Sequence, residues 1–402
     1  MVKPRRARGE AGARAAGNER MRCGCAALWR LLRSGRVLNR VLCRGSGPVW
    51  GLVVLVMCGL PALAQNAVRA RSIQVGDETR TYLLSQPAGA PGPRPTIIAL
   101  HGAAQTSESF KGYFGLEPTA AREGLVVAYP QGFGRVWDDS RPAAMRLKAA
   151  LRPGEDVPFL LALAQSLVAE GIADPNRIYL VGISNGGFMV ERMACEHAET
   201  FAAYAVIMAT APANVRETCR PARAVPIMFI HGTADPVIGW DGFWTPLGAT
   251  LSAPDSAALF AKANGCGDAQ VTELPDLAPY DGTRISVRRW EGCRDNAEVA
   301  LYRVERGGHQ PPARVETTGE LAQPFLGLRS QDMDSGEEIW AFFSRFSLAP
   351  APVAGALPGG PVPAPGTPAM RPAPAAGGRR DVPLPLPAPA RNSQAVKPAG
   401  GQ

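Results

Sequence analysis

The sequence is poor in histidine, the side chain that most often serves as a base or a metal ligand. It holds only four histidines in 402 residues. Any histidine base must therefore be chosen from His101, His197, His231 and His309. The four cysteines beyond residue 64 show no zinc spacing, so no metal site is expected.

The apolar run Val49 to Ala64 is too short for a typical membrane span. It comprises 16 residues, whereas a spanning helix needs about 20. Twelve cationic and two acidic side chains precede it, and it ends in Ala62-Leu63-Ala64. This pattern predicts a secretory signal over residues 1–64, cleaved before Gln65. An uncleaved anchor is the alternative, and the long leader leaves open a start at Met21.

Removal of this leader changes the charge of the chain. The whole sequence has a formal net charge of +8 and a pI near 9.3. Residues 65–402 keep 31 basic and 33 acidic side chains, a net charge of −2. The excess of basic side chains lies in the targeting segment, so nothing indicates a nucleic-acid partner. The mature protein is expected to be extracellular or periplasmic, without a stable membrane anchor.

The four cysteines beyond the leader are even in number, which indicates two disulfides in an exported protein. Three pairings are open. We favour Cys195–Cys219 and Cys266–Cys293, because each closes a loop of a few tens of residues. Free buried thiols are the alternative.

The C-terminal segment differs in composition from the rest of the chain. Residues 349–402 hold 14 of the 38 prolines, with alanine and glycine in most other places. Such a segment cannot bury enough apolar surface to offset the entropy of ordering, so a disordered tail is predicted. One domain is expected over residues 65–348.

Strand and helix patterns alternate along this domain. Two runs rich in strand-forming residues flank Gly76-Asp77 and predict a hairpin. Ser335-Gly336-Glu337-Glu338 predicts a capping box that opens the last helix. The alternation predicts an α/β fold, a mostly parallel sheet flanked by helices, with the active site at the carboxyl ends of the strands. Strands are predicted at 95–100, 125–129, 178–181, 225–230 and 299–304, and the other helices at 158–169, 187–197 and 256–264.

One pentapeptide carries the main chemical signal. Gly182-Ile183-Ser184-Asn185-Gly186 is a G-x-S-x-G sequence that follows an apolar strand and precedes a helical stretch. In that context a tight turn exposes the serine, which becomes a nucleophile beside a base. Ser184 is the predicted nucleophile, and a helix-capping serine is the alternative.

The chain order serine, acid, histidine selects two further residues. His309 follows a strand in the loop Arg306-Gly307-Gly308-His309, where a base is normally presented. A loop histidine without a role is the alternative. Asp235 lies just past a strand end, where its carboxylate would hold the imidazole in one tautomer. Asp241 is the reserve acid.

Two backbone N–H groups are expected to stabilise the negative charge of the transition state. One belongs to Asn185, the residue after the nucleophile, and the other to Ala103, in the loop after the third strand.

Short motifs over roughly residues 70–346 point to one enzyme family: Leu100-His101-Gly102, Tyr129-Pro130-Gln131-Gly132, Val136-Trp137 with Asp139, Glu155-Asp156-Val157 with Phe159, Gly182 to Gly187, His231 to Pro236, Asn264-Gly265-Cys266, Trp290 with Gly292-Cys293, Gly307-Gly308-His309, and Glu338-Ile339-Trp340 with Phe342-Phe343. They resemble the polyhydroxybutyrate depolymerases, close to the feruloyl and acetyl-xylan esterases of the α/β-hydrolase superfamily. The resemblance implies that fold, with both cysteine pairs as disulfides. Gln310-Pro311-Pro312 departs from the family's usual Trp-Pro after the histidine, and Ala103 from its frequent Cys or Tyr.

The predicted function is that of a secreted serine esterase without a cofactor. It would hydrolyse polyhydroxybutyrate oligomers, or feruloyl or acetyl esters, through an acyl-enzyme. A serine peptidase of the same fold and a non-catalytic hydrolase-like binding protein are the alternatives. Trp240, Phe243 and Trp244 either form a wall for the acyl or phenolic group or pack as a lid on themselves.

Overall fold

The structure is a computed structural model that describes residues 66–89, 92–141, 156–245, 248–315 and 323–348. The predicted signal over 1–64, its cleavage before Gln65 and the predicted tail over 349–402 lie outside these residues. Within the described ranges, no helix combines the length and apolar character that crossing a bilayer requires.

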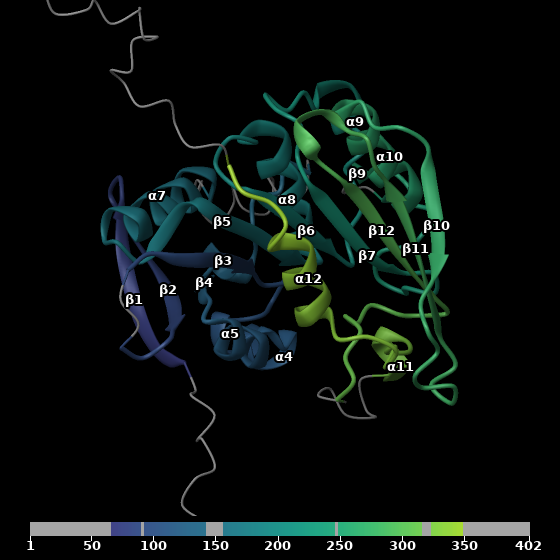
Figure 1. The fold of residues 1–402 in the computed structure, drawn as a ribbon, viewed down its shortest axis with the longest axis horizontal. Helices are drawn as coiled ribbons and strands as arrows, with labels where there is room; N and C mark the ends of the chain where they lie inside the picture. The colour runs from purple at the N-terminus through teal and green to yellow at the C-terminus, as the bar shows by residue number, and fades with distance from the viewer. Residues whose placement is uncertain (1–65, 90–91, 142–155, 246–247, 316–322, 349–402) are drawn as a thin grey trace, which may run out of the picture. The chain divides into compact units, whose positions relative to one another are not determined.

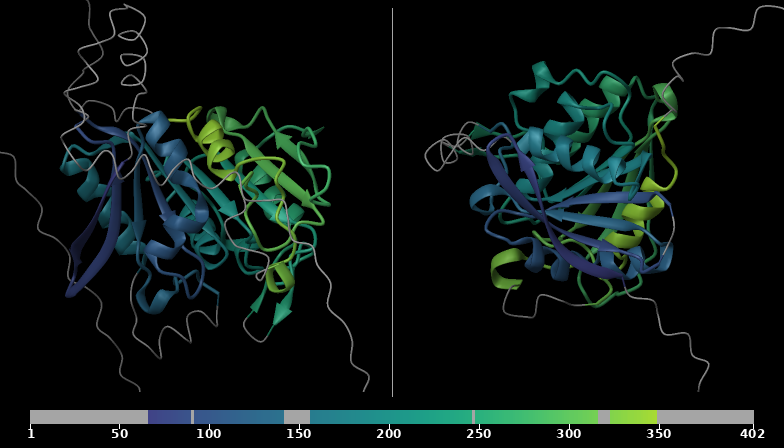
Figure 2. Two further views of the ribbon diagram at one scale, coloured as in Figure 1. Left: turned by 90° about the horizontal axis from the view of Figure 1, so that it is seen from below. Right: turned by 90° about the vertical axis from the view of Figure 1, so that its left-hand side faces the viewer.

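A mixed sheet forms the centre of the described part. Its strand order is β1-β2-β4-β3-β5-β6-β7-β12-β11-β10, and the strands from β4 to β12 in this order run parallel. The hairpin β1–β2, purple in Figure 2, lies at one end of the order, and β11 and β10 lie at the other. The bounds are β1 Ala67–Val75, β2 Glu78–Gln86, β3 Arg94–Leu100, β4 Val126–Pro130, β5 Ala173–Ile183, β6 Ala203–Ile207, β7 Ile227–Gly232, β10 Ala269–Glu273, β11 Arg284–Trp290 and β12 Val299–Glu305, with a separate short hairpin of β8 Trp244–Thr245 and β9 Gly248–Ala249.

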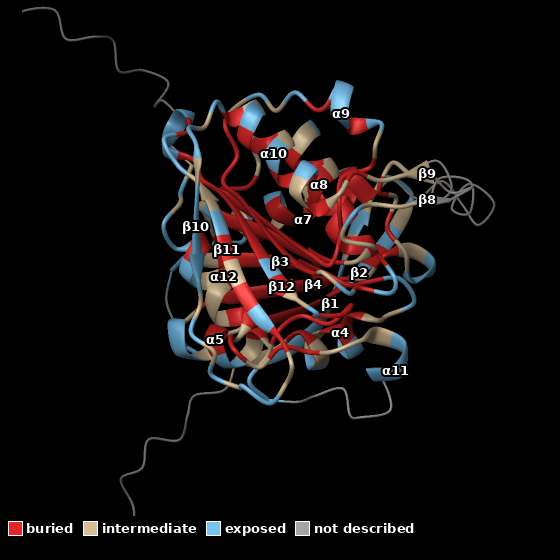
Figure 3. Cartoon of the chain, turned by 90° about the vertical axis from the view of Figure 1, so that its right-hand side faces the viewer, coloured by how far each residue is buried: buried red, intermediate tan, exposed pale blue. Residues whose placement is uncertain are grey.

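Helices cover both faces of this sheet (Figure 1). One core holds apolar side chains of α7, α8 and α10, and a second core holds those of α4, α5 and α12. Figure 3 shows the strands between them as buried. The bounds are α4 Ser107–Phe114, α5 Leu116–Glu123, α7 Asp156–Ala169, α8 Asn185–Glu196, α9 Val215–Thr218, α10 Ala253–Asn264, α11 Gln323–Leu326 and α12 Ser335–Phe343, with 3-10 turns at η1 Phe133–Arg135 and η2 Arg294–Asn296.

Strand β3 shows why its sequence is a continuous apolar run. Successive side chains of a strand point to opposite faces. Ile98 and Leu100 lie in the first core, whereas Ile97 and Ala99 lie in the second. Because both faces are covered, every position is apolar instead of every other one.

Each predicted strand and helix has a counterpart, with shifted ends. Strands β6, β10 and β11, the short hairpin β8–β9 and helices α4, α5, α9 and α11 have none among the predicted elements. β6 is only five residues long, and so short an apolar run does not distinguish a strand from a helix. β10 is mostly exposed and carries no apolar period.

The predicted capping box at Ser335 is wrong. Asp334 is the N-cap of α12, and its side chain accepts a hydrogen bond from the Gly336 N–H at 3.1 Å. Ser335 is the first helical residue, and its hydroxyl donates to the carbonyl of Pro312 at 2.7 Å. Both residue types cap helices well, so this tertiary hydrogen bond decides between them.

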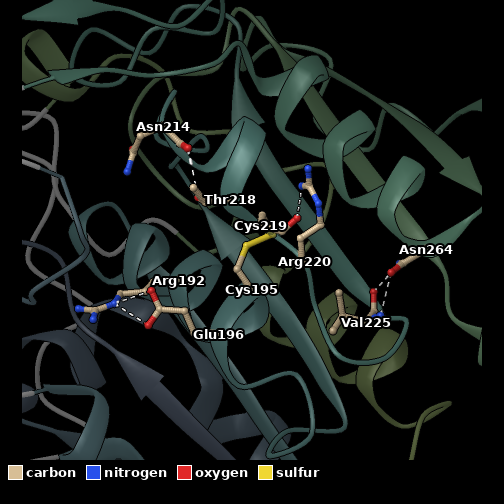
Figure 4. Close-up of a disulfide and its surroundings, with 9 residues drawn as sticks. All are labelled: Arg192, Cys195, Glu196, Asn214, Thr218, Cys219, Arg220, Val225 and Asn264. Carbon is tan, nitrogen blue, oxygen red and sulfur yellow. Dashed lines mark hydrogen bonds and ion pairs between the residues drawn. A yellow bond between two sulfur atoms is a disulfide. The ribbon is translucent and has the colours of Figure 1, made fainter. Parts of the chain in front are cut away.

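Both disulfides have the favoured pairing, with S–S distances of 1.99 Å for Cys195–Cys219 and 1.97 Å for Cys266–Cys293. Cys195 lies near the carboxyl end of α8, and Cys219 directly follows α9 (Figure 4). The first disulfide therefore joins the end of α8 to α9.

Candidate active site

Ser184 lies on a strained turn between β5 and α8. Its backbone has φ 54° and ψ −120°, a conformation that costs a non-glycine residue about 1–3 kcal/mol. The flanking glycines permit the turn by close approach. A Cβ on Gly182 would overlap the carbonyl of Gly186, and one on Gly186 would lie 2.5 Å from the carbonyl of Leu100. The turn is the one that the G-x-S-x-G sequence predicts.

The parallel register brings the candidate residues to one edge of the sheet. The Ser184 N–H donates to the carbonyl of Ile207 at the end of β6, at 2.8 Å. β7 and β12 follow as parallel neighbours of β6. The segments after β5, β7 and β12, which carry Ser184, Asp235 and His309, therefore leave the sheet at the same edge.

His309 and Asp235 form a direct hydrogen bond. The imidazole Nδ1 lies 2.7 Å from Asp235 Oδ2. The carboxylate side chain is fully buried, and its Oδ1 accepts from the N–H groups of Val237 and Ile238 at 2.8 Å each. Because an ionised carboxylate accepts only, Nδ1 carries the proton and Nε2 has a free lone pair. This tautomer lets Nε2 act as a base.

The backbone of residues 326–328 holds the histidine loop. The N–H of Gly308 donates to the carbonyl of Leu328 at 2.8 Å, and the N–H of His309 donates to that of Leu326. These bonds fix the loop that presents the imidazole, whose side chain is 10% exposed.

His231 supports the loop of Asp235, the residues that follow β7. It is buried, its Nε2 donates to the carbonyl of Ile238 at 2.8 Å, and this nitrogen lies 3.7 Å from Asp235 Oδ2. Burial lowers the pKa of the His231 imidazole, which favours its neutral form. The sequence shows this histidine only as the end of an apolar strand, so its supporting role could not be predicted.

One backbone amide of the loop after β3 has no hydrogen-bond acceptor among the described residues. The N–H of Gly102 donates to Gln105 Oε1 at 2.8 Å, and the N–H of Ala104 donates to the carbonyl of Arg135 at 2.9 Å. Among the described residues, the exposed Ala103 N–H between them has no hydrogen-bond acceptor. The Asn185 N–H lies in the first turn of α8, where N–H groups have no intrahelical acceptor.

His101 ties this loop to the segment after β4. Its Nδ1 donates to the carbonyl of Gly102 at 2.7 Å, and its Nε2 accepts from the Gly132 N–H at 3.0 Å. Burial lowers the pKa of the His101 imidazole, so the ring stays neutral in this role.

The remaining candidates lie apart from this hydrogen-bonded group. His197 is the C-cap of α8, and Asp241 is exposed. Trp240 packs against the first core, with its ring 6.1 Å from that of His231, which favours a packing role. Phe243 also packs against this core, and the Trp244 side chain lies outside the described residues. Among the residues that are described, no group of three His, Cys, Asp or Glu side chains could hold a metal ion.

The strand–turn–helix around Ser184 and the sheet order define an α/β-hydrolase, the predicted fold class. The chain is 30% identical over 265 residues to "Putative esterase NocK" of Nocardia uniformis subsp. tsuyamanensis, covering 62% of this chain and 76% of that one. The chain therefore belongs to the feruloyl esterase-like family of α/β-hydrolases, and it is a carboxylic ester hydrolase.

Other relatives are less similar in sequence. Feruloyl esterase B of Piromyces equi is 24% identical over 261 residues, which are 61% of this chain and 45% of that enzyme. The chain thus spans less than half of that relative. The prolyl oligopeptidase family model matches residues 121–213. A solved acetyl xylan esterase from Aspergillus awamori aligns with a TM-score of 0.42 and 15% identity, over 64% of this chain and 98% of that structure.

Proposed function

We propose that this protein is an exported serine esterase in which Ser184, His309 and Asp235 form the catalytic triad. The observation that carries the proposal is the 2.7 Å bond from His309 Nδ1 to a buried carboxylate, at the edge where the strained Ser184 turn lies. Such an arrangement prepares Nε2 to accept a proton.

The reaction follows from these roles. His309 Nε2 takes the proton of the Ser184 hydroxyl as the oxygen attacks the ester carbonyl. The N–H groups of Asn185 and Ala103 stabilise the oxyanion. The imidazolium then protonates the leaving alcohol, and water attacks the acyl-enzyme with His309 as base again. Asp235 stabilises the imidazolium throughout.

Soluble esters are the proposed substrates. The candidates are polyhydroxybutyrate oligomers and feruloyl or acetyl esters, and relatives named feruloyl esterases support the aromatic esters. An assay of all three ester classes on the mature chain separates them by kcat/KM.

A covalent label tests the nucleophile directly. A fluorophosphonate should modify Ser184, and Ser184→Ala should abolish both labelling and p-nitrophenyl acetate hydrolysis. Ser166→Ala, on the outer side of α7 where Ser166 bonds Glu170, is the matched control and should keep full activity. Labelling at another residue, or activity retained without the Ser184 hydroxyl, refutes the triad. An unlabelled wild-type protein would favour the binding-protein alternative.

A peptidase is the second candidate, because the prolyl oligopeptidase model matches the segment around Ser184. The two functions share a triad but differ in leaving group. Turnover of proline-containing peptide amides at a rate comparable with that of esters would support the peptidase.

Export is part of the proposal. A signal over residues 1–64 and the two disulfides support an oxidising destination. Mass spectrometry of the exported protein should find an N-terminus at Gln65. An intact leader would instead indicate an anchored protein.

A further inference from the structure

The segment of residues 135–139 contacts the loop that carries one oxyanion amide. The carbonyl of Arg135 accepts from the N–H of Ala104 at 2.9 Å. The indole Nε1 of Trp137 donates to the carbonyl of His101, also at 2.9 Å. Both bonds flank Ala103, so the position of its N–H depends on this segment.

The same segment binds the side chain of Asn185, whose backbone carries the other oxyanion amide. Asn185 Oδ1 accepts from the Trp137 N–H at 2.6 Å. Its Nδ2 donates to the carbonyl of Trp137 at 3.1 Å and to Asp139 Oδ2 at 2.6 Å. One acceptor and two donor bonds engage both polar atoms of the amide group. The first residue of α8 is therefore held from outside the helix.

Asp139 is a buried acid that pairs with Arg141. Its side chain is fully buried, and its Oδ2 accepts from Arg141 Nε at 3.0 Å and Nη2 at 2.6 Å. The Arg141 guanidinium lies 3.7 Å above the Phe188 ring of α8. A buried carboxylate persists only where it is paired and hydrogen-bonded, and its bond to Asn185 is charge-assisted.

We propose that Asp139 and the side chain of Asn185 are positioning residues for the oxyanion site: they hold the Asn185 N–H at a set distance from the Ala103 N–H. This inference rests on the proposed function. A strained backbone such as that of Ser184 persists only where the surroundings determine it. Oxyanion donors act best when no reorganisation is needed during the reaction. Arg135, Trp137 and Asp139 meet both needs, because they bond to both sides of the site.

Asp139→Asn tests this inference, with Asp138→Asn as the matched control. The first change keeps the shape of the side chain but removes the charge that holds Asn185. Asp138 is the adjacent acid, and its carboxylate lies 3.6 Å from Arg192 and forms no hydrogen bond with Asn185. We expect kcat of D139N to fall by roughly 10- to 100-fold while KM stays within about twofold, because only transition-state binding is lost. D138N should keep kcat within about twofold.

A transition-state analogue gives a readout that general loosening of the fold would not give. An alkyl boronic acid binds the serine and places an oxygen in the oxyanion site. Its Ki should rise in D139N by the same factor by which kcat falls, and stay unchanged in D138N. Trp137→Phe, which removes the bond to His101 but keeps the ring, should give a smaller loss in the same direction.

The outcomes separate the two proposals. If wild-type Ser184 reacts with a fluorophosphonate while folded D139N and W137F keep full kcat and boronate affinity, the positioning role is wrong and the triad stands. An equal loss in D138N also overturns the inference. If D139N does not fold, the W137F result decides. Wild-type protein that does not react at Ser184 removes the proposed function itself.

Discussion

The two halves of the candidate site are held by different kinds of interaction. On the nucleophile side, buried side chains fix the backbone. Asn185 bonds the Asp139 carboxylate, and His101 bonds the carbonyl of Gly102 and the N–H of Gly132. On the base side, backbone groups dominate, since residues 326–328 bind the loop of His309 through main-chain hydrogen bonds.

This difference predicts different sensitivities. A side-chain network depends on charge and on the identity of a few polar groups. A loop that is held by backbone hydrogen bonds and has glycines in close contact depends on the volume of its side chains. An added methyl group there meets atoms that cannot move aside. Among the supporting residues, polar substitutions should therefore damage the nucleophile side most, whereas the histidine loop should respond chiefly to an added methyl group.

The largest expected effect comes from the imidazole itself. His309→Ala should lower kcat by roughly 10⁴- to 10⁶-fold, because the proton acceptor is lost. His197→Ala, at the C-cap of α8, is the control and should leave kcat unchanged. Esterase kinetics with p-nitrophenyl acetate measure both. If H309A retains a tenth of the activity, the base lies elsewhere.

The steric sensitivity of the base side is tested by Gly308→Ala. A Cβ at this position would overlap the carbonyl of Leu326, so the loop must shift and kcat should fall by roughly 100-fold, with a stability loss of about 1–3 kcal/mol. Gly112→Ala is the matched control, because a Cβ there meets nothing within 4 Å. Alanine in that helical position should stabilise α4 by about 0.5–1 kcal/mol. Equal activity of the two variants would contradict the contrast between the halves.

The two disulfides allow the stability and the activity of the site to be compared. Their sequence separations, 24 and 27 residues, are nearly equal, so chain entropy predicts a similar loss of about 3.5 kcal/mol when either pair is replaced by alanines. Removal of Cys195–Cys219 alone should also lower kcat, because this bond anchors the far end of α8. Denaturation and kinetics of both double variants measure this, and a larger kcat loss without Cys266–Cys293 would reverse the expectation.

The last expected effect concerns stability alone and involves Glu191 of α8. Burial raises the pKa of its carboxyl well above the usual range, and neither oxygen has a hydrogen-bond partner among the described residues. The folded state therefore keeps a proton that the unfolded chain releases. Stability from this group is full below the ordinary carboxyl pKa of about 4.3 and is lost as pH rises toward the raised pKa, by about 1.4 kcal/mol per pH unit in between.

Glu191→Gln removes this titration and should flatten the loss of stability on the alkaline side. Denaturant unfolding of both proteins between pH 4 and 8 measures the difference, which should grow with pH in favour of the variant. Parallel curves would mean that Arg141 keeps the carboxylate ionised.

The triad stays a prediction, and it rests on sequence because each member follows a recognisable strand in a fixed chain order. Ser184 stands in a pentapeptide whose glycines have a steric reason, and the scarcity of histidine narrows the base to His309. The positions of these residues at one sheet edge follow from the parallel topology alone.

The supporting residues could not be predicted in this way. Asp139 and Asn185 are 46 positions apart, and nothing local to either reveals that their side chains meet. The family resemblance marks Trp137 and Asp139 without giving them a role. His101 and His231 end apolar strands, and only the folded structure shows that burial keeps their rings neutral.

Both disulfides join cysteines that are close in the chain, and this bears on how the protein matures. Any wrong pairing among the four cysteines would close loops of at least 47 residues, the spacing from Cys219 to Cys266. Shorter loops close at lower entropic cost. An oxidant acting on the still unfolded chain would therefore form the native bonds faster than the wrong ones.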